Sequence, residues 1–295
     1  MTPAVQRQTE ALADLLAAGP ALVVSGAGIS TDSGIPDYRD ADGRMRHASP
    51  MTYQQFVASA ADRRRYWARS HLGWHRIAAA RPNAGHLAVA ALQAAGRLSG
   101  VVTQNVDGLH TAAGTDGVID LHGRLDTVVC LDCGVRRPRL ELGLRLDAVN
   151  PGFRTGPAGR AASHRPDGDV VIPEDVVARF RVVGCRGCGG VLKPDVVFFG
   201  EHVPSARFRA ALDLLDRSAS LLVLGSSLMV GSGYRFVTAA VRRGLPVAIA
   251  TRGTTRGDRH AGLKVDAALG EVLPALAAEA AGRTGRQAHA AALAG

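Results

Sequence analysis

The chain has 295 residues, 46% of them hydrophobic, and its formal net charge is +9. This length predicts one large and one smaller domain, and the apolar content excludes a disordered chain. The sequence holds no run of eighteen apolar residues, so we expect no membrane-spanning helix. Its first ten residues lack the basic and then apolar order of a secretory signal, which predicts a cytoplasmic protein.

The positive charge comes almost entirely from arginine, because Lys193 and Lys264 are the two lysines of the sequence. A basic chain can attract nucleic acid. The arginines are scattered apart from a cluster at residues 63–65, and aromatic residues make up 4% of the chain, too few for a base-stacking pattern. We therefore interpret the composition as the coding bias of a GC-rich genome and expect no nucleic-acid partner.

The first half of the chain alternates helical patterns with short apolar runs. Gly19 and Pro20 end the first helix and introduce a partly β-branched run. A polar, turn-rich stretch that extends to Arg46 is too long for a simple connection, which indicates a functional loop. The patterns predict helices over residues 4–18, 53–80 and 83–95, and strands over residues 21–25, 100–103 and 117–120.

The cysteines of the sequence form two Cys-x-x-Cys pairs: Cys130, Cys133, Cys185 and Cys188. Two such pairs predict a tetrahedral zinc site, because each turn brings two thiolates to one side of a metal ion. Fifty-one residues separate the pairs, which favours a metal that fixes the base of an inserted module. Two disulfides are the less favoured alternative in a cytoplasmic chain, and a thioredoxin-like redox pair is less favoured still.

The second half of the chain adds further strands. Residues 134–184 are rich in arginine, proline and glycine, and helical periodicity is limited to about 169–180. Apolar runs predict strands over residues 195–199, 221–224 and 246–250. Apolar strands that alternate with helices indicate an α/β fold whose parallel sheet is covered on both faces.

We expect a Rossmann-like parallel sheet with helices on both faces and a small zinc-binding module. The tail is expected to be loosely ordered. The predicted boundaries are residues 1–129 for the first part of the Rossmann-type domain with a helical insertion at about 40–82, 130–190 for the zinc module, 191–282 for the second part, and 283–295 for a flexible tail.

Gly26-Ala27-Gly28 follows the first strand, as the start of a dinucleotide-binding loop does. Glycines at such a turn let backbone N–H groups approach a pyrophosphate. The third glycine of that motif would stand at Thr31 and is absent, so a tight turn with no ligand is the alternative.

The wider sequence resembles the sirtuins, a family of NAD-dependent protein deacylases. Their motifs are matched in order, from about Val5 to Leu276, by the segments at residues 26–39, 103–110, 120–123, 193–201 and 225–230. Both Cys-x-x-Cys pairs fall where sirtuins hold structural zinc. Residues 65–69 and 73–74 resemble class II, which includes many bacterial members, and the desuccinylase group is set aside because its Tyr-x-x-Arg pair is not identified in this helix.

The resemblance implies a protein-lysine deacylase that uses NAD as co-substrate and holds one structural zinc ion. The acyl group would pass to ADP-ribose, with release of nicotinamide and O-acyl-ADP-ribose, and the partners would be proteins that carry acylated lysines. A protein mono-ADP-ribosyltransferase on the same scaffold is the first alternative, although the presence of Asn105 and His122 favours deacylation. The second alternative is a non-catalytic, NAD-sensing protein that binds nucleic acid.

The resemblance also implies a role for each matched residue. His122 would be the general base, since an imidazole has a pKa near neutrality, and Asn105 would hold the ribose hydroxyls and a water molecule. Turn capping is the alternative for Asn105 and Asp107. Thr251 departs from the asparagine that is common in the family. The expected cofactor contacts are Gly26, Ala27, Gly28, Asp37, Tyr38, Arg39, Gln104, Asn105, Asp107, Gly225, Ser226, Ser227, Thr251, Gly253 and Leu269, and the expected substrate contacts are Val196, Phe198, Phe199, Gly200, Glu201 and Val230.

Overall fold

The computed structural model describes residues 1–37, 44, 50–155, 163–164 and 170–294, and the side chains of 163–164 and 283–294 are not described. Its largest sheet has six parallel strands in the order β11-β10-β9-β1-β2-β3. The strands are β1 (Ala21–Ser25), β2 (Leu98–Thr103), β3 (Ile119–Asp120), β9 (Ser220–Leu224), β10 (Val247–Ala250) and β11 (Leu263–Val265).

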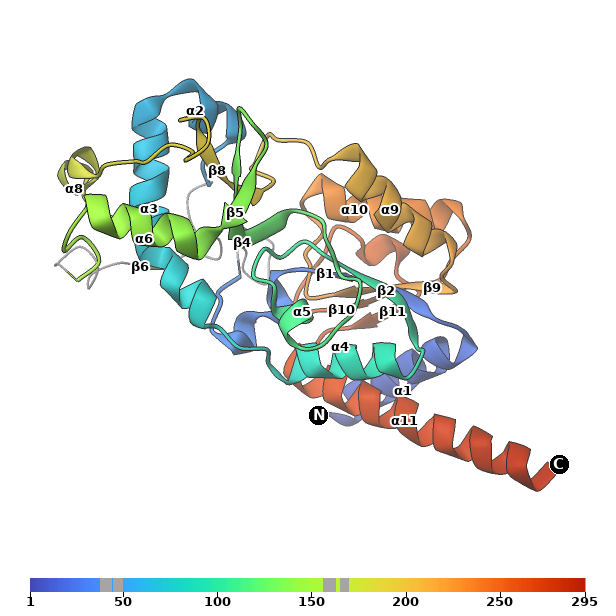
Figure 1. The fold of residues 1–295 in the computed structure, drawn as a ribbon. Coiled ribbons are helices and arrows are strands. Elements are labelled where there is room, and N and C mark those ends of the chain that lie inside the picture. Colours follow the sequence, from blue (N-terminus) through green and yellow to red (C-terminus); the bar gives the residue numbers. More distant parts are fainter. Residues whose placement is uncertain (38–43, 45–49, 156–162, 165–169, 295) are drawn as a thin grey trace.

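Helices cover both faces of this sheet, as the unbroken apolar runs of its strands require. Val23 faces one layer of helices, whereas its neighbours Leu22 and Val24 face the other, because side chains alternate along a strand. One layer consists of α1 (Pro3–Ala18), α4 (Ala84–Ala94) and α11 (Leu269–Ala294), and the other of α9 (Ser205–Asp216) and α10 (Gly231–Arg242) (Figure 1). The predicted Rossmann-like sheet is confirmed.

The point where the strand order reverses lies beside β1. The chain builds the sheet outward from β1 through β2 to β3, and then returns to place β9 on the other side of β1. Open α/β sheets bind their ligands at the carboxyl ends of the strands at such a point. The fold therefore directs attention to the loops that follow β1, β2 and β9.

A second, three-stranded antiparallel sheet lies between β3 and α9 in the chain. It has the order β5-β4-β8, with β4 at Gly123–Cys130, β5 at Arg136–Pro138 and β8 at Leu192–Val196. This sheet extends a few residues beyond both predicted boundaries of the zinc module. The predicted strand over 195–199 is therefore corrected: the strand begins and ends earlier, and it pairs with β4 instead of joining the parallel sheet. An apolar run carries no information about the strand with which it pairs.

Helices complete the smaller module. Trp67 and Leu72 of α3 (Ala60–Ala79) pack against Leu142 of α6 (Arg139–Val149) and Val177 of α8 (Glu174–Arg179). The predicted helix over 53–80 is divided into α2 (Tyr53–Ala58) and α3, because Ser59 is extended and its hydroxyl accepts the Asp62 N–H at 3.2 Å. The described chain also contains the short elements α5 (Leu109–Ala112), β6 (Ser163–His164) and β7 (Val170–Val171), and three short 3-10 helices, Ala27–Ile29, Thr31–Ser33 and Asp258–His260.

The last helix extends further than the sequence analysis predicts. α11 runs from Leu269 to Ala294, so the backbone of the tail that was expected to be loosely ordered is helical. Alanine is the strongest helix former, and residues 283–294 contain many alanines, which accounts for the difference. In Figure 1 the end of this helix projects beyond the rest of the molecule.

Candidate active site

A cavity of about 1240 Å³ lies at the carboxyl ends of β1, β2 and β9 and continues toward the smaller module. Most of the expected contacts line it: Gly26, Ala27, Gly28, Asp37, Gln104, Asn105, Asp107, His122, Val196, Phe198, Phe199, Gly200, Glu201, Gly225, Ser226, Ser227, Val230, Thr251 and Leu269. Gly253 is not among the lining residues; its N–H donates to Asp266 Oδ1 at 3.0 Å, and its carbonyl accepts from Lys264 Nζ at 3.0 Å. Tyr38 and Arg39 lie outside the described residues.

The glycines after β1 permit a close contact between two loops. The N–H groups of Gly26 and Gly28 donate to the carbonyls of Leu224 and Gly225, at 2.9 and 2.8 Å. A Cβ atom on Gly28 would lie 2.9 Å from the Cα atom of Gly225, which excludes any side chain there. In this conformation the two N–H groups serve the contact between the ends of β1 and β9, and they are not directed at a pyrophosphate.

His122 follows β3 and is held at both ring nitrogens. Its Nδ1 lies 2.9 Å from the carbonyl oxygen of Gln104, which can only accept, so Nδ1 carries the proton of the neutral ring. Its Nε2 lies 2.8 Å from the hydroxyl of Ser232. Burial lowers the pKa of His122 below 6.5 against a smaller opposing effect of the Gln104 carbonyl. The imidazole is therefore neutral at pH 7 and can accept a proton at Nε2.

Asn105 and Asp107 are tied together by the hydroxyl of Ser30. Asn105 Nδ2 donates to Ser30 Oγ at 3.0 Å and to the Gly26 carbonyl at 3.2 Å, which leaves the amide oxygen as an acceptor. Ser30 donates to Asp107 Oδ2 at 2.8 Å, and Asp107 Oδ1 accepts the Leu109 N–H at 2.9 Å. Asp107 thus caps the start of α5 and also lines the cavity. The turn-capping interpretation and a position at the candidate site are therefore compatible.

Sequence reasoning missed the residues that support this hydroxyl. The Asn83 N–H lies 3.4 Å from Nδ1 of His86, so the proton of the neutral ring sits on Nε2, which lies 3.5 Å from Ser30 Oγ. His86 is completely buried, and burial lowers its pKa. The position of Ser30 in the Gly-Ala-Gly-Ile-Ser segment could have indicated that this serine lies at the site. Its contact with His86 could not be predicted in this way, because it comes from packing between distant segments.

Gln104 connects three strand ends. Its side-chain amide donates to Ser226 Oγ at 2.8 Å and to the Ser25 carbonyl at 3.2 Å. A Cβ atom on Gly233 would collide with its amide oxygen, so the start of α10 packs directly on this side chain. Gln104 therefore fixes the relative positions of β1, β2, β9 and α10 around the cavity.

The segment after β8 forms the opposite wall. Lys193 is buried, and its ammonium lies 3.0 Å from Glu201 Oε2, which also accepts the Phe198 N–H at 2.8 Å. The same ammonium lies 4.7 Å from the centre of the Phe198 ring. Burial lowers the pKa of Lys193, and the carboxylate of Glu201 opposes this effect. The ion pair fixes the turn from Phe198 to Glu201, which carries four of the expected substrate contacts. Phe199 and Val230 at the lip of the cavity are 40% and 38% exposed.

Five residues of α3 line the cavity without having been predicted to do so: Asp62, Arg65, Tyr66, Arg69 and Arg76. Tyr66 packs edge-on against Phe56 at 5.4 Å, and Arg65 pairs with Asp62 and Glu174. Tyr66 and Arg69 have the Tyr-x-x-Arg spacing whose absence was given as the reason for setting the desuccinylase group aside. That reason was wrong, because the residues of the pair stand in the sequence at this helix.

Asp120 precedes His122 by two residues and titrates in an unusual range. Burial raises the pKa of Asp120 to about 6, and the nearby Arg124, 3.8 Å away, only partly offsets this effect. Its Oδ1 atom is buried and has no hydrogen-bond partner among the described residues. The ionised form of this carboxyl is therefore less stable in the folded chain than in the unfolded chain.

We expect Asp120→Asn to raise the thermal stability more at pH 7.5 than at pH 4. Above the folded-state pKa of about 6, the wild-type protein must bury a charge that the unfolded chain exposes to water. As the pH falls from about 6 to 4, the folded protein takes up this proton before the unfolded chain does, so the destabilising effect becomes small. Thermal melts over this pH range would measure the effect, with exposed Asp116→Asn as the control. An equal shift of Tm at both pH values would contradict the prediction.

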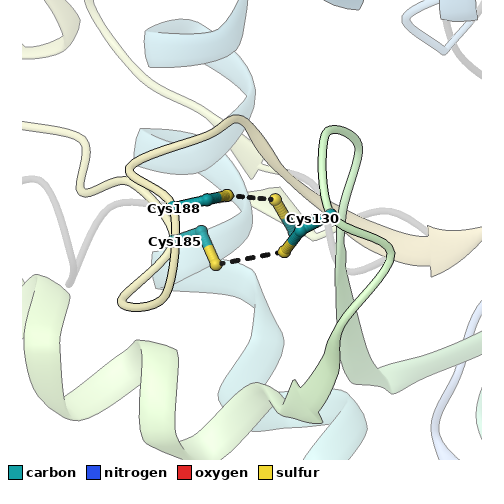
Figure 2. Close-up of side chains that lie close together, drawn as sticks. Cys130, Cys185 and Cys188 are labelled. Carbon is teal, nitrogen blue, oxygen red and sulfur yellow. Dashed lines mark hydrogen bonds between the residues drawn. The ribbon is translucent and has the colours of Figure 1, made fainter.

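The four cysteines form a cluster between the end of β4 and the loop that precedes β8 (Figure 2). The Sγ atoms of Cys130 and Cys188 are 3.5 Å apart, and those of Cys133 and Cys185 are 3.8 Å apart, far beyond the ~2.0 Å of a disulfide. All four Sγ atoms lie within 4.8 Å of one another. Tetrahedral Zn–S bonds of ~2.3 Å would place sulfur atoms ~3.8 Å apart, so the residues fit a structural zinc site.

The described helices include none with the length and apolar character to cross a membrane.

The comparisons with known proteins agree with this geometry. The model of the Sir2 family matches residues 26–232. The chain is 57% identical over 266 residues to NAD-dependent protein deacetylase 1 of Streptomyces coelicolor, which covers 90% of this chain and 88% of that protein. It is 52% identical over 270 residues to NAD-dependent protein deacetylase 1 of Mycobacterium avium, which covers 91% of this chain and 94% of that protein.

Two solved structures show the same fold. A structure of a Sir2 protein with a p53 peptide and NAD+ has a TM-score of 0.69 at 28% identity and covers 90% of this chain and 95% of its own. A structure of Sir2 bound to an acetylated peptide has a TM-score of 0.68 at 27% identity, with the same coverage of both chains. A family model that matches most of the chain and relatives that are more than half identical over nine tenths of it give one conclusion: the chain belongs to the Sir2 family.

Proposed function

We propose that this protein is an NAD-dependent protein-lysine deacylase that transfers the acyl group to ADP-ribose. The observation that carries the proposal is the neutral imidazole of His122, whose Nε2 atom lies in the same cavity as the side chains of Asn105 and Gln104. The relatives named above are deacetylases, and Sir2 structures of this fold hold NAD and acetylated peptide. When bound, NAD supplies the ribose carbon from which nicotinamide leaves.

The size and polarity of the cavity fit two substrates. A cavity of about 1240 Å³ exceeds the ~300–1,000 Å³ of a typical site for one small molecule. Thr251 and Leu269 would hold the adenosine end of NAD, and Ser226 and Ser227 the ribose and phosphates beside it. Asn105 would accept from a ribose hydroxyl through its uncommitted amide oxygen, and Asp107 would accept from the nicotinamide carboxamide.

The acylated lysine would enter between the Phe199–Glu201 segment and Val230. Both sides carry exposed apolar side chains at the lip, and Val196 and Phe198 form the wall behind it. Main-chain pairing on both sides of an extended peptide reads little sequence, so we expect weak peptide selectivity. His122 would take up the proton of a ribose hydroxyl at Nε2, and Tyr38 would exclude water.

Within the family we assign the chain to class II on the segments at residues 65–69, 73–74 and 193–199. We also propose the cytoplasm as its compartment, because reduced cysteines persist there. Tyr66 and Arg69 in the cavity wall make acidic acyl chains a necessary part of any substrate panel.

We expect the pure protein to remove at least one acyl group from acyl-lysine peptides only when NAD is present. Mass spectrometry of acetyl, propionyl, longer aliphatic and acidic acyl peptides, with and without NAD, would measure this, and O-acyl-ADP-ribose would appear with the free lysine. If every acyl group is retained and ADP-ribose is attached to protein, the protein is a mono-ADP-ribosyltransferase instead. No consumption of NAD would contradict both enzymatic functions.

A further inference from the structure

We propose that Ser232 is a positioning residue that holds the imidazole of His122 in both of its protonation states. The proposal rests on the proposed function, in which His122 is the general base. Ser232 belongs to none of the motifs that carry the family resemblance, and it lines the same cavity as His122. Its hydroxyl lies 2.8 Å from His122 Nε2, the nitrogen that must accept the proton.

The other ring nitrogen is already committed. The Gln104 carbonyl accepts from Nδ1 at 2.9 Å, and a carbonyl oxygen cannot donate. Nδ1 therefore keeps its proton throughout, and only Nε2 changes between an acceptor and a donor. Any group that contacts Nε2 must therefore donate a hydrogen bond before proton uptake and accept one after it.

A hydroxyl meets both requirements by rotating. Ser232 Oγ–H can donate to the lone pair of neutral Nε2, and its oxygen can accept from Nε2–H when the ring is charged. A backbone carbonyl could satisfy only the charged ring, and a backbone N–H only the neutral ring. The bond to the charged ring is the stronger of the two, because charge-assisted hydrogen bonds are about twice as strong as neutral ones.

The position of Ser232 is fixed by the start of α10. Val230 is the residue before the helix, and Ser232 is its second residue. The next residue, Gly233, packs so closely on the Gln104 side chain that a Cβ atom would collide with it. Gln104 thus supplies the carbonyl at Nδ1 and also sets the distance of α10, which supplies the hydroxyl at Nε2. His122 is held from two sides by one connected unit.

The charged groups around His122 are few among the described residues. Arg207 of α9 faces it, donates to the Leu121 carbonyl at 3.4 Å, and lowers the pKa of the imidazole, although burial is the larger cause. Asp120 on the neighbouring strand titrates near pH 6 and lies under the influence of the same arginine. Neither group contacts Nε2, so Ser232 is the described side chain whose loss acts on that nitrogen alone.

The test is Ser232→Ala, studied first in the enzyme without NAD. Nitrogen-15 NMR of the His122 ring over pH would follow both nitrogens, and we expect the Nε2 signal to shift and the apparent pKa of His122 to fall. The pKa falls because the alanine variant loses the stronger bond, the one to the charged ring. Asp120→Asn in both backgrounds removes the nearby carboxyl, whose pKa of about 6 would otherwise affect the His122 titration.

In turnover we expect Ser232→Ala to lower kcat by about tenfold while the KM for NAD changes less than twofold. Ser232→Thr keeps the hydroxyl and should restore both the NMR signature and kcat. Ser232→Cys, a second loss of the hydroxyl at nearly constant volume, should reproduce the alanine result. Thr238→Ala is the matched control, because it removes a hydroxyl of the same helix that donates to the Arg235 carbonyl and lies outside the cavity lining.

Two results would overturn the proposal. One is a His122 titration in folded Ser232→Ala that superimposes on that of the wild type. The other is an equal loss of kcat in Ser232→Thr and Ser232→Ala, which would show that packing and not the hydroxyl matters. The NMR readout needs no turnover, so failure of this proposal is distinguishable from failure of the deacylase function.

Discussion

Replacement of His122 by alanine is expected to lower kcat for deacylation by about 10²–10⁴-fold, the usual contribution of a positioned general base. Alanine removes the only atom in the cavity that we assign to proton uptake, Nε2. It also removes the contacts with the Gln104 carbonyl and the Ser232 hydroxyl, but both of those groups line the cavity and can bond to water. Steady-state rates with an acetylated peptide and NAD would measure the loss.

The fold should survive this change. The ring adds no ion pair to the described structure, and burial already opposes its charged form. The control is His75→Ala, which removes an exposed histidine of α3 outside the cavity. Turnover within a few-fold of the wild type in His122→Ala would remove His122 from the mechanism. A loss of the same size in the His75 variant would show that the effect is not specific.

Cys130→Ser is expected to destabilise the smaller module more than any surface substitution, and zinc removal should act in the same way. Structural zinc sites contribute folding free energy on the order of 10 kcal/mol in small modules, because the metal binds only the folded arrangement of thiolates. Cys130 is buried, so the serine hydroxyl would replace a thiolate that water does not reach. Zinc content and thermal melts of the variant, and of the wild type with a chelator, would measure the effect.

Leu131→Ser is the matched control for this prediction. Leu131 stands inside the first Cys-x-x-Cys turn and is 37% exposed, and its N–H bonds to the Val191 carbonyl, which the substitution keeps. The control should retain one zinc ion per chain and a nearly unchanged Tm. A wild-type protein without zinc, or a Cys130→Ser variant with an unchanged melting curve, would contradict the assignment of the metal site.

The sequence predicts the parallel sheet well because its strands carry unbroken apolar runs. Val23 and Leu222, for example, lie in segments that only a sheet buried on both faces can accommodate. The strand that holds Lys193 and Val196 was misplaced, since pairing with β4 depends on the return of the chain across fifty or more residues. Local sequence patterns do not indicate with which distant strand a segment pairs.

The cavity was predictable where motifs name residues, and unpredictable where packing brings single residues in. Asn105 and His122 stand in segments that the family resemblance marks, and the structure places both in one cavity. Ser232 lines the same cavity from a helix, and nothing in its immediate sequence distinguishes it from a surface residue. Tyr66 stands in a Tyr-x-x-Arg spacing that the sequence analysis overlooked. Their positions follow from how α10 and α3 dock, which is a property of the whole chain.

Strand β4 connects the candidate active site to the four-cysteine cluster. His122 precedes its first residue and Cys130 is its last. The strand pairs at both ends with β8, which ends at Val196 in the cavity wall, and the register shifts between Arg124 and Val128. Eight residues of extended chain span only about 26 Å. Loss of the metal would therefore loosen the cysteine-bearing end of the smaller module and the substrate wall together, while the parallel sheet keeps its own core. A metal held by the four cysteines would thus act on the shape of the substrate wall through β4 and β8, without contact with any reacting atom.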